Sequence, residues 1–147
     1  MIRRGIFIGG LAALGAAIVA GFRLGADGAP NVTRTTPSGD DLSADRSMLL
    51  VDIRRPEEWV QTGVVQGALL VTYTEPNAFL AAITPHLEEG QKIGLICRSG
   101  NRTSRAARQI AGLTNATIVD IGGGMLRVMA EGYKPVAPTR AMGCSVC

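Results

Sequence analysis

Cysteine is scarce in this chain of 147 residues, which contains three. With so few cysteines the protein cannot be a small domain held together by a disulfide framework. Aromatic residues make up 4% of the chain, and no basic stripe is interleaved with them, so the sequence gives no sign of a nucleic-acid partner. The net charge of +3 falls to +1 once Arg3, Arg4, Arg23 and Asp27 are left out, so the basic balance belongs to the N-terminal end.

The ligand sets of a metal centre are also missing. Cys144 and Cys147 form a C-terminal Cys-x-x-Cys, which supplies two thiolates. Two thiolates are half of a zinc set, and the sequence contains no second pair. We therefore expect neither a metal nor a cofactor.

The N-terminus has the layout of a membrane or export segment. A positive end with Arg3 and Arg4 precedes an uncharged stretch from Gly5 to Phe22. As a helix this stretch would be about 27 Å long, close to the hydrocarbon core of about 30 Å. We expect residues 1–24 to form a signal peptide or a membrane anchor helix. No clean Ala-x-Ala cleavage site follows, so both alternatives stay open, and both place the remaining chain on the periplasmic side of a bacterial inner membrane.

The rest of the chain divides by composition. Residues 25–41 are rich in Gly, Pro, Ser, Thr and Asp and are expected to form a linker. Short apolar runs without alternation then suit strands buried on both faces of a parallel sheet, and helix candidates separate them. The strand candidates are 48–53, 68–72, 93–96 and 116–121, and the helix candidates are 56–60, 76–83, 103–113 and 124–131. This alternation predicts an α/β domain with helices on both faces over 42–137, followed by a flexible tail, 138–147.

One of these apolar runs ends in Cys97, which small, turn-forming and basic residues and then a helix follow. Ligands bind at the carboxyl ends of parallel strands, where loop N–H groups and the positive end of a helix dipole form an anion site. Arg98 and Arg102 add positive charge beside it. We expect a cysteine at this position to carry a thiolate at neutral pH. An inert, buried cysteine is the alternative, but an apolar site would not recruit two arginines.

The same residues resemble single-domain rhodanese-like sulfurtransferases. Leu50 to Trp59 is similar to the first signature of that family, and Cys97 to Arg102 is similar to its Cys-led six-residue loop. Three further segments give support: 63–68 matches the family's glycines and alanine, and 122–126 and 132–136 resemble its C-terminal signature. The resemblance covers about 42–136. Val64, Gln66 and Val128 replace the usual His, Pro and Trp; they lie outside the active loop and bear on substrate identity rather than chemistry.

The resemblance implies sulfur transfer through a Cys97 persulfide, with a small anion such as thiosulfate as donor. The acceptor would be thiophilic: cyanide or a thiol, including a protein thiol. The resemblance implies no cofactor. The residues expected to bind the substrate are those after the cysteine: Arg98, Ser99, Gly100, Asn101, Arg102 and Thr103.

Two pairs of residues have two interpretations each. Asp52 and Arg54, at the end of the first predicted strand, either brace the active loop through an ion pair or form a solvated strand-end pair. Cys144 and Cys147 either form a disulfide with little structural role or act as thiols on a mobile arm that takes sulfur from Cys97.

Two other functions remain open. Phosphatases and arsenate reductases also use an anion loop that runs from Cys to Arg, with one residue more than the four between Cys97 and Arg102. The shorter loop makes a smaller cradle, which suits one sulfur atom better than a tetrahedral oxyanion. The second alternative is a non-catalytic binding module tethered at the membrane, which the presence of Cys97 and both arginines argues against.

Overall fold

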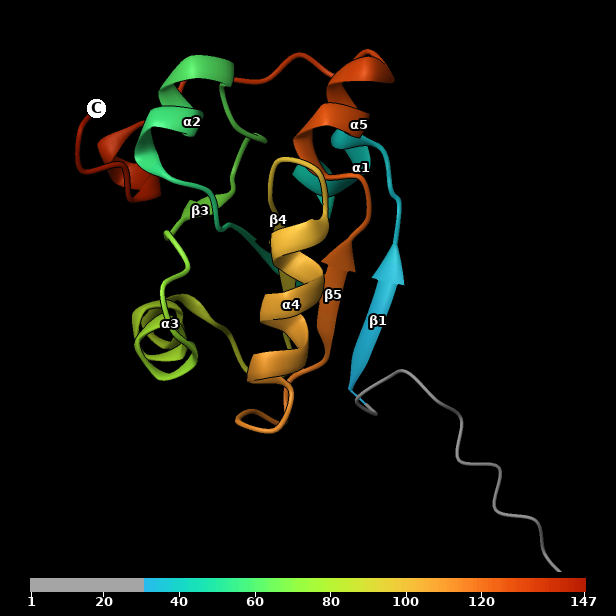
Figure 1. Cartoon of the computed structure of the whole chain (residues 1–147), viewed down its shortest axis with the longest axis vertical. Helices are drawn as coiled ribbons and strands as arrows, with labels where there is room; N and C mark the ends of the chain where they lie inside the picture. Colours follow the sequence, from blue (N-terminus) through green and yellow to red (C-terminus); the bar gives the residue numbers. More distant parts are fainter. Residues whose placement is uncertain (1–30) are drawn as a thin grey trace, which may run out of the picture.

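The computed structural model describes residues 31–147 and contains a parallel five-stranded sheet (Figure 1). The order of the strands is β1-β5-β4-β2-β3, and every neighbouring pair is parallel. The strands are β1 (Val32–Thr35), β2 (Met48–Asp52), β3 (Leu69–Leu70), β4 (Lys92–Ile96) and β5 (Ile118–Ile121). Parallel pairing brings the carboxyl ends of the strands to the same edge of the sheet.

Helices cover both faces of the sheet. They are α1 (Gly39–Ala44), α2 (Pro56–Thr62), α3 (Pro76–Ile83), α4 (Asn101–Ile110) and α5 (Gly124–Ala130), with 3₁₀ turns at Thr84–His86 and Arg140–Met142. The buried side chains of α3 and α4 pack on one face, and those of α1 and α5 pack on the other. In Figure 1, α2 lies beyond the end of the sheet toward which the strands point.

Successive side chains of a strand pack into opposite halves of the core. In β2, Leu50 packs in the cluster that contains Met125 of α5, whereas Val51 packs in the cluster that contains Phe79 of α3 and Ile110 of α4. Successive side chains of a strand point to opposite faces, so a strand covered on both sides needs apolar residues at consecutive positions. This burial explains the unbroken apolar runs in the sequence.

The predicted α/β fold with helices on both faces is confirmed. Four predicted strands and four predicted helices occur in the structure; the helix predicted over 76–83 has the predicted ends, and the other elements differ at one or both ends. The strand predicted over 68–72 is reduced to Leu69–Leu70, and the last strand begins at Ile118 rather than at 116. The helix predicted over 103–113 begins earlier, at Asn101, so its first turn belongs to the active loop.

The linker prediction for residues 25–41 is wrong over its second half. Val32–Thr35 forms the edge strand β1, which pairs with β5 from Val32 opposite Ile118 to Thr35 opposite Ile121. The side-chain amide of Asn31 also donates to three carbonyl groups of the segment before β5. The strand was missed because it buries little side-chain surface and is held by backbone hydrogen bonds, which leave no apolar pattern in the sequence.

Helix α1 also lies in the predicted linker. The side chain of Ser38 accepts the N–H of Asp41, and the carboxylate of Asp41 accepts the N–H of Ser38. This reciprocal arrangement is a capping box, which compensates for polar residues that would otherwise favour a loop. The helix then buries Leu42 against the sheet. The domain therefore begins before residue 42.

The C-terminal segment 138–147, predicted to be a flexible tail, is attached to the domain through Cys144, and its last three residues are exposed. Cys144 is 1% exposed and contacts the cluster that contains Trp59 of α2 and Leu70 of β3. A cysteine side chain behaves as a small hydrophobe, and this one anchors the end of the chain.

The anchor or signal helix expected at 1–24 lies outside the described residues. No helix within residues 31–147 combines the length and apolar character that a membrane span needs.

Candidate active site

Cys97 lies directly after β4, where the chain turns toward α4. The backbone N–H of Gly100 donates to Sγ of Cys97 at 3.1 Å, and the hydroxyl oxygen of Thr103 lies 3.9 Å from the same sulfur. Gly100 adopts a φ of +91°, a left-handed conformation that glycine tolerates. The Cys97 side chain is 1% exposed and packs on the core, but its sulfur is in contact with polar groups rather than with hydrocarbon alone.

The other side of the active loop rests on the N-terminus of α5. The carbonyl oxygen of Cys97 accepts the N–H of Met125 at 2.8 Å, and that of Arg98 accepts the N–H of Leu126 at 2.9 Å. The close approach depends on Gly124, which has a φ of +56°. A Cβ atom at Gly124 would overlap the carbonyl oxygen of Cys97 and lie 2.8 Å from that of Arg98. The glycine-rich segment 122–126 therefore supports the loop directly.

A polar network that the sequence does not predict lies behind the loop. Oγ of Ser104 lies 2.6 Å from Oδ2 of Asp120 and 3.0 Å from the carbonyl oxygen of Gly100. The guanidinium of Arg34 donates to Ser104 and pairs with Asp120 at 3.1 Å. Asp120 is 4% exposed at the end of β5, so this network ties two strands to the first turn of α4. The one signal of this network in the sequence is Asp120, an acidic residue inside the apolar run 116–121.

Arg102 is held by Glu58 of α2, a second contact that the sequence does not predict. Its two terminal nitrogens donate to the two carboxylate oxygens of Glu58 at 2.7 and 2.5 Å. These hydrogen bonds, together with the N–H of Arg55, lower the pKa of Glu58 from 4.5 to about 2. The same contact raises the pKa of Arg102 above its usual value. A bidentate pair of this kind fixes the orientation of the guanidinium plane.

The ion pair between Asp52 and Arg54 is buried, so the interpretation as a solvated strand-end pair is wrong. The two side chains are 0% and 1% exposed, and Nη2 of Arg54 lies 2.7 Å from Oδ2 of Asp52. Arg54 also donates to the hydroxyl of Thr62 and to the carbonyl of Gly63, at the end of α2. The pair therefore braces α2, which carries Glu58, and acts on the active loop through that helix.

The remaining residues of the loop form its rim. The side chains of Arg98, Ser99 and Asn101 are exposed. Arg98 lines a hollow of about 270 Å³ that also includes Glu58 and Leu126. Within residues 31–147 the guanidinium of Arg98 has no hydrogen-bond partner, so its positive charge is available to an anion at the mouth of the loop.

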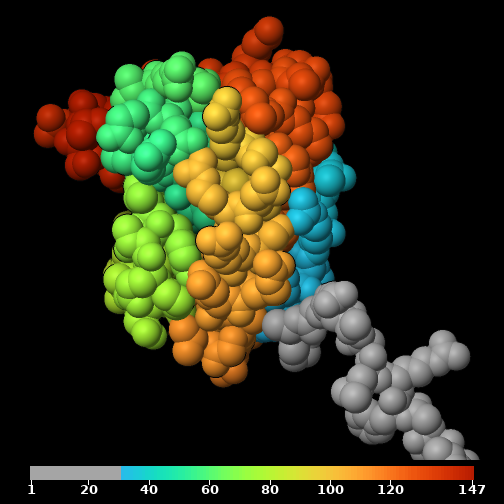
Figure 2. Space-filling view, in the orientation of Figure 1, coloured from blue at the N-terminus to red at the C-terminus, as the bar shows by residue number. Residues whose placement is uncertain are grey.

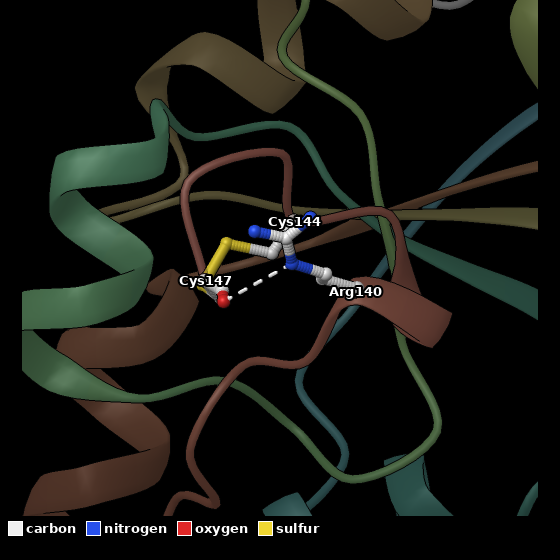
Figure 3. Close-up of a disulfide and its surroundings, with 3 residues drawn as sticks. All are labelled: Arg140, Cys144 and Cys147. Atoms are coloured by element: carbon white, nitrogen blue, oxygen red, sulfur yellow. Dashed lines mark hydrogen bonds between the residues drawn. A yellow bond between two sulfur atoms is a disulfide. The ribbon is translucent and has the colours of Figure 1, made fainter.

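The two C-terminal cysteines form a disulfide, one of the two alternatives that the sequence left open (Figure 3). Nε of Arg140 lies 3.4 Å from the carbonyl oxygen of Cys147. Cys144 packs in the cluster of α2 and β3, whereas Cys97 packs in the cluster of α3 and α4. The structure therefore brings the six loop residues together around Cys97 and leaves the disulfide in another part of the domain.

The fold resembles those of known proteins. Three solved structures share the fold. A rhodanese-related protein from Thermoplasma volcanium is 26% identical, with a TM-score of 0.54 over 70% of this chain and 98% of that one. A protein of unknown function from Rhodopseudomonas palustris, described as a possible tyrosine phosphatase, is 22% identical, with a TM-score of 0.55 over 69% and 83%. A rhodanese-like domain from Anabaena is 17% identical, with a TM-score of 0.50 over 68% and 76%.

No curated protein matches the chain. The family model of the rhodanese-like domain matches residues 37–134, a range that runs from just before α1 to just after α5 and includes the whole active loop. The family includes sulfurtransferases and phosphatase-like relatives. With two thirds of its length matched, this chain belongs to the rhodanese-like domain family.

Proposed function

We propose that the protein is a sulfurtransferase that moves sulfane sulfur from an anionic donor such as thiosulfate to a thiophilic acceptor. The observation that carries this proposal is the contact between Sγ of Cys97 and the N–H of Gly100, at the N-terminal end of α4. A positive helix end and backbone donors stabilise an anionic sulfur. Arg98 at the rim would attract the donor.

The reaction divides into two half-reactions. The thiolate of Cys97 attacks the outer sulfur of thiosulfate; a bond forms between the two sulfurs, the bond to the sulfonate breaks, and sulfite leaves with the electron pair. Cyanide or a thiolate then attacks the terminal sulfur of the persulfide, and Cys97 leaves as the thiolate. Covalent catalysis in two such steps gives ping-pong kinetics. The first N–H groups of α4 have no acceptor inside the helix, so they are suited to hold the terminal sulfur.

The geometry of Arg102 favours sulfur over phosphorus chemistry. A phosphate transition state carries charge on several oxygens and needs a bidentate arginine. Both terminal nitrogens of Arg102 are already used by Glu58, and the loop is one residue shorter than that of the phosphatases. A persulfide carries its charge on one terminal sulfur and can be held by backbone donors alone. We therefore rank phosphatase and arsenate reductase activity below sulfur transfer.

The experiment that tests this proposal is the formation of thiocyanate from thiosulfate and cyanide, with Cys97→Ser as the control. We expect activity in the wild type and none in the variant. Mass spectrometry after treatment with thiosulfate alone would show one added sulfur atom on the peptide that carries Cys97. Hydrolysis of an aryl phosphate without thiocyanate formation would favour the phosphatase instead, and absence of both activities would indicate a binding module.

We also propose that residues 1–24 direct the protein across a bacterial inner membrane, as an anchor or as a cleaved signal. Support comes from the arginines before the uncharged stretch. Fractionation of cells that express the full chain, followed by mass spectrometry of its N-terminus, would distinguish the two. Recovery of the uncleaved chain in the soluble cytoplasmic fraction would contradict both.

A further inference from the structure

A second hollow borders the active loop, and Arg98 is not among the residues that line it. It has a volume of about 390 Å³ and lies between α4 and the segment that joins β3 to α3. Figure 2 shows these two segments side by side on the exposed face of the domain. The residues that line it are Tyr73, Thr74, Asn101, Arg102, Arg105, Ala106 and Gln109. Two of them, Asn101 and Arg102, are also residues of the active loop.

The charge of this hollow is positive. No carboxylate lines it, and Arg102 and Arg105 lie one turn apart on the same face of α4. Arg102 is neutralised by its two hydrogen bonds to Glu58. Arg105 is exposed and makes neither a hydrogen bond nor an ion pair within residues 31–147. Glu75, which follows Thr74 in the chain, does not line the hollow, and its oxygens accept the first N–H groups of α3. Arg105 is therefore the cation that remains available to a ligand.

Most of the other residues that line the hollow are polar, and two of them are held in place by contacts. The hydroxyl of Tyr73 donates to Oε1 of Gln109 at 2.9 Å, which turns the NH₂ group of that amide away from the tyrosine. The ring of Tyr73 is held by Phe79, with ring centroids 5.1 Å apart. Thr74 and Asn101 add hydroxyl and amide donors. A cation surrounded by neutral donors is the arrangement that recognises a carboxylate on a small polar molecule.

The volume is larger than the proposed donor, a small inorganic anion, requires. Pockets for small organic molecules are about 300–1,000 Å³, and this hollow falls within that range. Asn101 and Arg102 line the hollow and also belong to the loop that begins at Cys97, so an organic molecule bound there would lie against the active loop. The second half-reaction requires such a molecule, namely the acceptor.

We propose that this hollow binds the carboxylate of a low-molecular-weight thiol, with Arg105 as its main ligand, and that this thiol is the sulfur acceptor. The inference rests on the proposed sulfurtransferase function and adds a binding site for its acceptor. The acceptor thiolate attacks the terminal sulfur of the Cys97 persulfide. A new sulfur–sulfur bond forms on the acceptor, the bond to Cys97 breaks, and Cys97 is released as the thiolate, so no external oxidant or reductant is needed.

The test compares glutathione with its diethyl ester, in which both carboxylates are blocked, with thiosulfate as donor. The variant is Arg105→Gln. The matched control is Arg108→Gln, which removes an arginine of the same helix that does not line the hollow. For Arg105→Gln we expect KM for glutathione to rise at least about tenfold, the loss typical of one charged hydrogen bond. KM for the ester and the rate with cyanide should stay at wild-type values, and Arg105→Lys should recover part of the loss.

Several outcomes would overturn the inference. An equal effect of Arg105→Gln on glutathione, its ester and cyanide would assign Arg105 a structural role. An equal effect of Arg108→Gln would mean that the net charge of α4, not the hollow, attracts the acceptor. In both cases thiocyanate formation by the wild type leaves the sulfurtransferase proposal intact, whereas its absence refutes that proposal and the inference that depends on it.

Discussion

The ion pair between Glu58 and Arg102 allows a quantitative prediction. It joins α2 to the first turn of α4 and orients one of the two arginines of the active loop. Glu58→Gln removes the negative charge but keeps an oxygen that can still accept the N–H of Arg55 at the start of α2. The variant therefore tests the charge of Glu58 separately from its capping role.

The size of the effect follows from the pKa of Glu58, which the contacts lower from 4.5 to about 2. At ~1.36 kcal/mol per pKa unit, this difference corresponds to an upper limit of about 3 kcal/mol. Solvent screens the pair, because the Arg102 side chain is 42% exposed, and fully exposed pairs contribute about 0–1 kcal/mol. Glu58 itself is only 15% exposed, so we expect Glu58→Gln to lower the free energy of unfolding by about 1–2 kcal/mol at neutral pH.

The pH dependence has a definite sign. The pKa of Glu58 in the folded protein lies below the unfolded value of 4.5, so its charge contributes full stability above pH 4.5. That contribution is lost as the pH falls from about 4.5 toward 2. The difference in stability between the wild type and Glu58→Gln should therefore be constant near neutrality and shrink in acid.

Urea unfolding provides the measurement, with the fluorescence of Trp59 as the probe, since this is the single tryptophan and is 2% exposed. The matched control is Glu57→Gln, on the same helix, whose exposed carboxylate forms no ion pair within residues 31–147. Equal losses in the two variants, or a loss that does not change between neutral and acidic pH, would refute the reasoning.

Three further predictions concern the supports of the site. Gly124→Ala should reduce thiocyanate formation at least about tenfold, because its Cβ would displace the active loop; Gly132→Ala, with the same sign of φ and open space, is the control and should keep activity. Arg54→Met should lower the free energy of unfolding by about 3–5 kcal/mol, since Asp52 stays buried and unpaired, and Asp52→Asn should recover part of it. Cys147→Ser should lower the free energy of unfolding by about 2 kcal/mol, because the disulfide closes a short loop. If thiols discharge the Cys97 persulfide of this variant at the wild-type rate, Cys144 and Cys147 do not act as a sulfur relay.

The sheet and the active loop could be predicted because their signals are local in the sequence. Strands buried on both faces need unbroken apolar runs. The run that ends in Cys97 is followed three positions later by Gly100, and the helix begins at the next residue. These features depend on neighbouring residues, whose spacing can be read directly.

The supports of the loop could not be predicted because they join residues that lie far apart. Glu58 is 44 positions from Arg102, and Arg34 is 86 positions from Asp120. A glutamate at the start of a helix has the same sequence context whether it faces solvent or an arginine. The edge strand β1 was missed for a related reason, since its register is set by backbone groups that every residue carries.

The role of α5 connects the fold to the chemistry. Met125 and Leu126 donate their N–H groups to the carbonyl oxygens of Cys97 and Arg98, so those oxygens point toward α5. In a planar trans peptide the N–H points opposite to the carbonyl, so the two peptide N–H groups that follow are turned away from α5. The orientation of these two N–H groups is therefore fixed in the protein before any sulfur donor or sulfur acceptor binds. Gly124, which makes this contact possible, bears on the reactivity of Cys97 although it contributes no side chain to the site.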